Sequence, residues 1–145
     1  MTRFHKNLVR TVFFISLLFS FTNLFAEKIT DRDFGFSLDI PEGFEIADYT
    51  QDGMSYVFSH SNIPVTLIMK ITEESKSPSA AEVLKKTLNK LSAKGSTDSF
   101  EWNGTSCGIS SFTMTLDDNY FGWSVAAPVK IKNYYVLIKM LLLKK

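Results

Sequence analysis

The spacing of apolar side chains constrains this chain most: beyond residue 26 it mainly follows a period of two, and it changes to a helical period once. From Phe34 to Ile40, for example, every second residue is apolar, which is the pattern of a strand with one buried face. Such segments predict strands over residues 34–40, 44–47, 54–59, 65–72, 99–102, 105–116, 120–129 and 134–143. Polar turn sequences separate them, and the clearest is Asn103-Gly104, a dipeptide that favours two-residue hairpins.

The segment from Ser79 to Lys94 is the exception and predicts a helix. Ser79 and Glu82 have the spacing of a capping box, in which each side chain accepts a hydrogen bond from an amide of the first turn. Apolar residues then recur at helical spacing and leave the lysines for solvent: Val83, Leu84, Leu88 and Leu91. Gly95 is expected to end the helix, because glycine is favoured just beyond helix C-termini.

The order of these elements predicts an α+β fold, in which an antiparallel sheet carries the helix on one face. The last segment, residues 134–143, is apolar on both faces apart from Lys139. That composition is typical of an interior strand with cover on both sides. No internal repeat or low-complexity linker divides residues 27–145, so we expect them to form a single domain.

The first 26 residues have the pattern of a secretory signal peptide. Arg3, Lys6 and Arg10 precede an apolar stretch that ends at the small residue Ala26. This stretch is shorter than the roughly 20 apolar residues that a spanning helix needs. We therefore expect export to the periplasm or the exterior, cleavage between Ala26 and Glu27, and no membrane span in the remaining chain. The alternative is that the segment stays attached as an anchor.

Removing this segment changes the charge of the chain. Of the 16 lysines and arginines, 13 remain against 15 acidic residues, so a net charge of +1 becomes −2. Because no positive surplus is left to neutralise phosphates, nucleic-acid binding is not expected.

Cys107 is the only cysteine, which excludes an intramolecular disulfide. Its place within an expected strand predicts a small buried hydrophobic side chain.

The start of the remaining chain is similar to a known family. Residues 34–44 form an alternating strand, then Pro41, then the aromatic Phe44. This segment resembles the first hairpin of the PsbP-like family, and the later order of strands and helix is similar as well. The resemblance implies an antiparallel sheet flanked by helices on both faces, in a domain that is generally non-catalytic. The family usually adds a helix after its last strand, and no such helix is expected here.

Motifs for catalysis, metal binding or phosphate binding are missing from the sequence, so no catalytic, cofactor or metal-binding residue is predicted. The acidic segment Asp117-Asp118-Asn119 is read as a turn, because the residues that follow it offer no further oxygen ligands. His60 is the basis of an alternative hypothesis, a small envelope hydrolase or ligand-binding enzyme. Such an enzyme would need a serine and an acid beside His60 in space.

The favoured hypothesis is an exported, non-enzymatic module that binds an unidentified protein or other component of the cell envelope. An aromatic or apolar patch left uncovered on the sheet would suit such a partner. The predicted partner surface consists of Tyr120, Tyr135, Leu141 and Leu143. Phe121 and Trp123 alternate with small residues and are expected to belong to the core instead.

Overall fold

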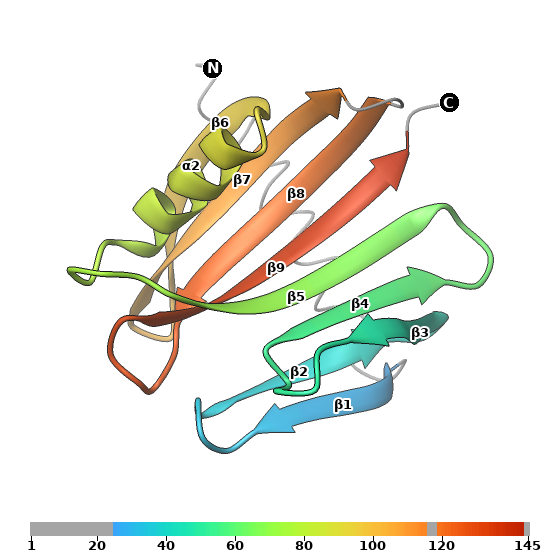
Figure 1. The fold of residues 1–145 in the computed structure, drawn as a ribbon, viewed down its shortest axis with the longest axis horizontal. Helices are drawn as coiled ribbons and strands as arrows, with labels where there is room; N and C mark the ends of the chain where they lie inside the picture. The colour runs from blue at the N-terminus through green and yellow to red at the C-terminus, as the bar shows by residue number, and fades with distance from the viewer. Residues whose placement is uncertain (1–24, 116–118, 144–145) are drawn as a thin grey trace.

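The computed structural model describes residues 25–115 and 119–143 (Figure 1). Within these ranges the chain forms nine strands and one helix. The elements are β1 (Phe25–Asp31), β2 (Phe36–Pro41), β3 (Phe44–Tyr49), β4 (Ser55–His60), β5 (Val65–Glu73), α2 (Ala80–Lys90), β6 (Lys94–Trp102), β7 (Thr105–Thr115), β8 (Asn119–Pro128) and β9 (Tyr134–Leu143).

Seven of the strands form one antiparallel sheet in the order β3-β4-β5-β9-β8-β7-β6. β9 lies at the centre, between β5 and β8, which confirms the interior position predicted from its two apolar faces. α2 carries the chain from β5 to the edge strand β6, and β6 to β9 return as a meander (Figure 1). The predicted α+β fold with a helix packed on an antiparallel sheet is therefore confirmed.

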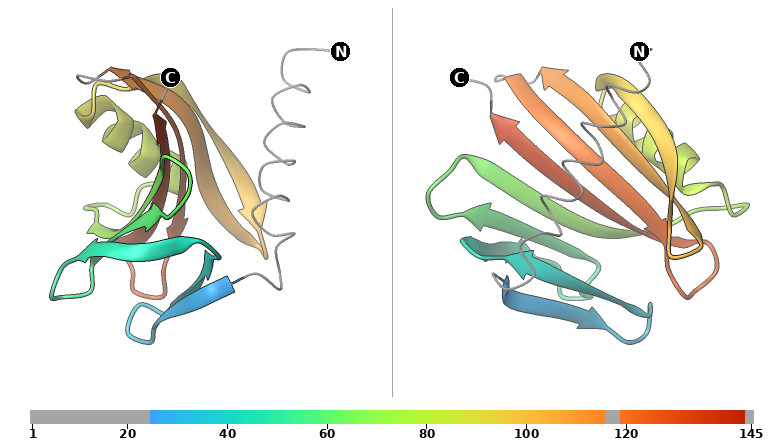
Figure 2. Two further views of the ribbon diagram at one scale, coloured as in Figure 1. Left: turned by 90° about the vertical axis from the view of Figure 1, so that its right-hand side faces the viewer. Right: turned by 180° about the vertical axis from the view of Figure 1, so that it is seen from behind.

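Two further layers cover the sheet, one on each face (Figure 2). α2 packs mainly on β7 and equally on its neighbours β6 and β8. We call this face the helix-side face. The two-stranded sheet β1-β2 lies against the opposite face, where Ile40 packs with Phe58, Leu67 and Met69 of β4 and β5. The two layers thus cover different halves of the sheet on opposite faces.

Small side chains explain where α2 sits. On the helix-side positions of β7 and β8, Gly108 pairs with Ala126 and Ser110 pairs with Ser124, while Gly122 lies across from Phe112. A Cβ atom added to Gly108 would lie 2.8 Å from the carbonyl oxygen of Ala80, in the first turn of the helix. The small residues therefore let the helix backbone approach the sheet, and Val83 and Leu84 fill the space between them.

The helix begins as predicted and ends earlier than predicted. The Ser79 amide donates to Glu82 Oε2 at 2.7 Å and the Glu82 amide to Ser79 Oγ at 3.2 Å, which completes the capping box. The helix ends at Lys90 because Ser92 adopts the left-handed conformation, with φ of 52°, and the Ala93 amide donates to the Leu88 carbonyl. Gly95, the expected terminator, instead belongs to β6.

The N-terminal hairpin also differs from the prediction. β1 was not predicted, and it pairs with β2 in a regular register from Glu27 to Asp31. Phe34 lies in the connecting turn rather than in the strand, because its amide donates to Asp31 Oδ1 and Gly35 has a positive φ of 71°. The predicted signal peptide up to residue 24 and the predicted turn at residues 117–118 lie outside the described residues.

Replacing Gly108 with alanine tests the close approach of α2. The added methyl group would overlap the Ala80 backbone, so we expect the free energy of unfolding to fall by about 2 kcal/mol, the usual range for overpacking. Urea unfolding followed by circular dichroism measures the change. Ser106→Ala, at an exposed position of the same strand, should change stability by less than about 0.5 kcal/mol. Equal stability of both variants would contradict this packing.

Candidate interaction surface

His60 is the last residue of β4, where it pairs with Phe44 of β3, and its side chain binds the backbone of the loop that follows. Its Nδ1 accepts hydrogen bonds from the amides of Asn62 at 3.0 Å and Ile63 at 3.3 Å. The ring packs edge-on against Phe44 and also lies over Gly43, where a Cβ atom would come within 2.4 Å of Nε2. The lone pair that a general base would use is therefore occupied by two amides. The geometry gives the His60 side chain a structural role in holding the loop after β4.

We expect His60→Ala to lower the free energy of unfolding by about 1 kcal/mol, because two amides lose their acceptor in a solvent-exposed loop. Thermal or urea unfolding measures this effect. Ser61→Ala, a change to the exposed next residue, serves as the control and should match the wild type. A His60→Ala protein as stable as the wild type would show that these hydrogen bonds do not support the loop.

Cys107 lies in β7 and is 3 % exposed, which confirms the predicted buried side chain. Burial raises the pKa of its thiol. A reactive cysteine needs the opposite shift, toward the thiolate. Cys107 therefore packs as a small hydrophobic residue on the face opposite α2, beside Phe100 of β6.

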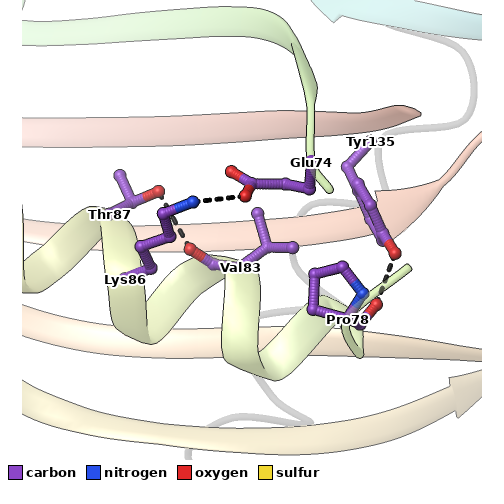
Figure 3. A network of polar contacts seen from close by, with 6 residues as sticks. All are labelled: Glu74, Pro78, Val83, Lys86, Thr87 and Tyr135. Atoms are coloured by element: carbon purple, nitrogen blue, oxygen red, sulfur yellow. Dashed lines mark hydrogen bonds and ion pairs between the residues drawn. The ribbon is translucent and has the colours of Figure 1, made fainter. Parts of the chain in front are cut away.

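Tyr135, one of the four residues of the predicted partner surface, is only 5 % exposed. Its ring lies in the core cluster under α2 with Val83 and Leu84. Its hydroxyl donates a short hydrogen bond to the carbonyl oxygen of Pro78, just before the helix (Figure 3). The expectation that Tyr135 lies on an open patch is thus wrong, because the connection from β5 to β6 places the helix over it.

The loop between β5 and α2 is joined to the rest of the domain by further contacts. Glu74 is buried, and its carboxylate pairs with the Lys86 ammonium of α2 at 2.5 Å (Figure 3). The Glu74 amide donates to the carbonyl oxygen of Asn133 at 2.8 Å, and the Ser77 hydroxyl donates to the Asn133 side chain. These contacts hold the loop between β5 and α2 against the β8–β9 turn, so they determine how α2 enters the helix-side face.

Tyr135→Phe tests the hydrogen bond that joins the Tyr135 hydroxyl to the carbonyl oxygen of Pro78. Loss of the hydrogen bond to Pro78 should lower the free energy of unfolding by about 1 kcal/mol. Burial, with the charges of Glu74 and Glu82, raises the pKa of Tyr135 above its ordinary value near 10. Its contribution is therefore complete below about pH 10 and is lost as the pH rises toward the folded-state pKa.

Unfolding measured from pH 8 to pH 11 should show the difference between wild type and Tyr135→Phe shrinking above about pH 10. Tyr134, whose pKa is also raised, is present in both proteins and cancels in this difference. A difference that grows with pH would contradict the assigned role of the Tyr135 hydroxyl.

The other three residues of the predicted partner surface are brought together by register. Tyr120 lies directly across from Leu143, and Gly122 lies across from Leu141. We call Tyr120, Leu141 and Leu143 the sheet-end cluster; all three side chains are half-buried. Leu141 packs against the core cluster around Leu88 at the end of the helix. The sheet-end cluster therefore continues the apolar core outward to the surface.

Beside α2, the helix-side face continues over β9, β5 and β4. In the part of the chain that the structure describes, no other element packs on this region (Figure 1). We call it the open half. Its side chains alternate with the buried residues of the opposite face and are half-buried or exposed: Val57, Ser59, Thr66, Ile68, Lys70 and Lys139. The alternation of residues 65–72 does not by itself show that the helix leaves Ile68 uncovered.

The interpretation of Phe121 and Trp123 as core residues is only partly right. They lie on the face opposite α2, where Phe121 is 40 % exposed and Trp123 is half-buried. Trp102 of β6 is 46 % exposed. The alternation separated the two faces of β8, but the fully buried face is the one that carries the small residues Gly122, Ser124 and Ala126 under α2. The β1-β2 layer on the face of Phe121 and Trp123 packs against β4, β5 and β9.

Two further features of the described residues concern metal binding and membrane spanning. Among residues 25–115 and 119–143, no group of three or more histidine, cysteine, aspartate or glutamate side chains could hold a metal ion. Within the same ranges, no helix combines the length and apolarity needed to cross a membrane.

These features define an antiparallel α+β domain with one covering helix and a helix-side face that is half open. Solved structures show the same fold. The cyanobacterial PsbP protein, CyanoP, of Synechocystis sp. PCC 6803 superimposes with a TM-score of 0.60 at 16% identity, over 80% of this chain and 79% of that one. The Ran-binding protein Mog1p of Saccharomyces cerevisiae superimposes with a TM-score of 0.56 at 13% identity, over 82% and 77%.

The fold is therefore PsbP-like, as the resemblance of residues 34–44 implied. The implied helices on both faces are not seen, because within the described residues α2 packs on one face and the β1-β2 hairpin packs on the other. No protein-family model matches the sequence. No curated protein sequence matches it either.

Proposed function

We propose that this protein is an exported, non-enzymatic interaction module of the cell envelope. The observation that carries the proposal is the half-open helix-side face. There the sheet-end cluster and Ile68 form a half-buried apolar surface beside α2. Apolar surface of this kind, rimmed by polar residues, marks sites of protein association. Mog1p, which shares the fold, is itself described as a Ran-binding protein.

Export is supported by the N-terminal pattern and is compatible with the first hairpin. The register between β1 and β2 skips Ala26 and is regular from Glu27 onward. Cleavage after Ala26 would therefore keep the regular pairs, from Glu27–Ile40 to Asp31–Phe36. The enzyme alternative loses its support, because Nδ1 of His60 is occupied by two amides.

N-terminal sequencing of the protein recovered from the periplasm or medium tests export. We expect the sequence to begin at Glu27, because the basic start, the apolar stretch and Ala26 form a cleavable signal. Intact Met1 on protein in the soluble cytoplasmic fraction would contradict export.

A photo-crosslinking amino acid at position 143 tests the interaction surface. We expect a discrete crosslinked product in the living cell, because Leu143 lies at the surface end of the sheet-end cluster. The matched control places the same amino acid at position 131, where Ile131 is 41 % exposed in the β8–β9 turn on the opposite end of β9. Identical products from both positions, or none from position 143, would contradict a partner at this surface.

A further inference from the structure

Lys139 is the single charged residue of β9. β9 consists otherwise of apolar and aromatic residues and occupies the centre of the sheet. The side chain lies on the helix-side face, because it alternates with Val136, Ile138 and Met140, which pack against the opposite layer. It is half-buried. A lysine at the centre of a sheet weakens the strand unless its charge has a partner.

The positions around Lys139 supply no such partner. Ser124 and Ile68 lie directly across from it on β8 and β5. The remaining neighbours on this face are Leu137, Leu141, Gly122, Ala126, Thr66 and Lys70. The single charged neighbour, Lys70, has the same sign as Lys139. No ion pair joins either lysine to a carboxylate in the part of the chain that the structure describes.

The hydroxyl of Ser124 does not compensate for the missing carboxylate, because it donates its hydrogen bond to the carbonyl oxygen of Ile138 at 3.2 Å. Burial lowers the pKa of Lys139, and the nearby charge of Lys70 lowers it further. Both effects mean that the charged form of Lys139 is disfavoured in the protein alone. A carboxylate brought close to the two lysines would offset both effects, because an opposite charge favours the charged form of each lysine.

The geometry of the sheet determines which kind of partner fits. Neighbouring strands lie about 4.8 Å apart, and packed helices lie about 8–10 Å apart. A helix beside α2, which is centred on β7, would therefore be centred two strands away, over β9. Ile68 and Leu141 would meet its apolar side. Lys139 and Lys70 would lie along the same helix.

We propose that the open half binds an acidic amphipathic helix of a partner protein, with Lys139 and Lys70 contacting its carboxylates. This inference rests on the proposed interaction function and names the chemistry of the partner. The apolar positions supply contact area, and the two lysines supply charge complementarity and select against basic helices.

Two synthetic helical peptides of 18 residues test the proposal. Both carry the same leucine face; one has glutamates beside it and the other has lysines at the same positions. They are titrated into the isotope-labelled protein, obtained by expressing the full chain, and NMR chemical shifts are recorded. We expect the glutamate peptide to shift the amide signals of Ile68, Lys139 and Leu141, and the lysine peptide to leave them unchanged.

Variants then assign the interaction to the two lysines. Lys139→Met should weaken binding of the glutamate peptide about tenfold, the usual effect of losing one charged contact, and Lys70→Gln should weaken it less. Lys132→Gln, at an exposed position in the β8–β9 turn, serves as the control and should bind like the wild type. Lys139→Met should also raise Tm by about 3 °C, because an uncompensated charge is removed. Weaker binding would then not result from unfolding.

Several results would overturn the inference. Equal binding of both peptides would show that the surface is only apolar. Binding of anionic lipid vesicles that depends on Lys139, without binding of the glutamate peptide, would assign the lysines to a membrane. A Lys139→Met protein with a lower Tm would assign Lys139 to the fold. If a crosslink at position 143 persists while peptide charge has no effect, the acidic-partner inference fails and the interaction function stands.

Discussion

The pairing of β9 between β5 and β8 is the interaction on which the rest of the structure depends. It joins Val65–Glu73 to Tyr134–Leu143, so two segments far apart in the sequence become neighbours at the centre of the sheet. It also joins the hairpins β3-β4-β5 to the meander β6-β7-β8. The chain between β5 and β9 includes α2, so the same pairing places the helix over the meander. The β1-β2 layer covers the other half of the sheet on the opposite face. The open half follows from this offset.

Local patterns predicted most of the elements because their causes are local. Alternation identified the strands, and the Ser79–Glu82 pair identified the start of the helix. Errors arose where a residue type took an uncommon role. Ser92 ends the helix in a conformation more typical of glycine, so Gly95 was free to enter β6. β1 was missed because its pairing with β2 depends on the turn around Gly35 rather than on its own composition.

The candidate surface could be predicted only in part, because coverage depends on long-range packing. Alternation placed Tyr120, Leu141 and Leu143 on one face, and the register confirms that they adjoin. It could not show that α2 buries Tyr135 or leaves Ile68 half-buried, since both depend on where the small residues of β7 and β8 let the helix sit. Lys139 was visible as an interruption of an apolar strand. That Lys139 lacks an oppositely charged neighbour could be seen only from the strand register, which makes Lys70 its single charged neighbour on the face.

In this structure α2 protects one half of the helix-side face and leaves the other half accessible. NMR relaxation of methyl groups in the presence of a soluble paramagnetic agent tests it most directly. We expect strong relaxation for Val57 and Ile68 of the open half, and little for Val83 and Leu84, which are 1 % and 0 % exposed. Equal protection of all four methyl-bearing residues would contradict it, because it would show that the protein itself already covers the open half.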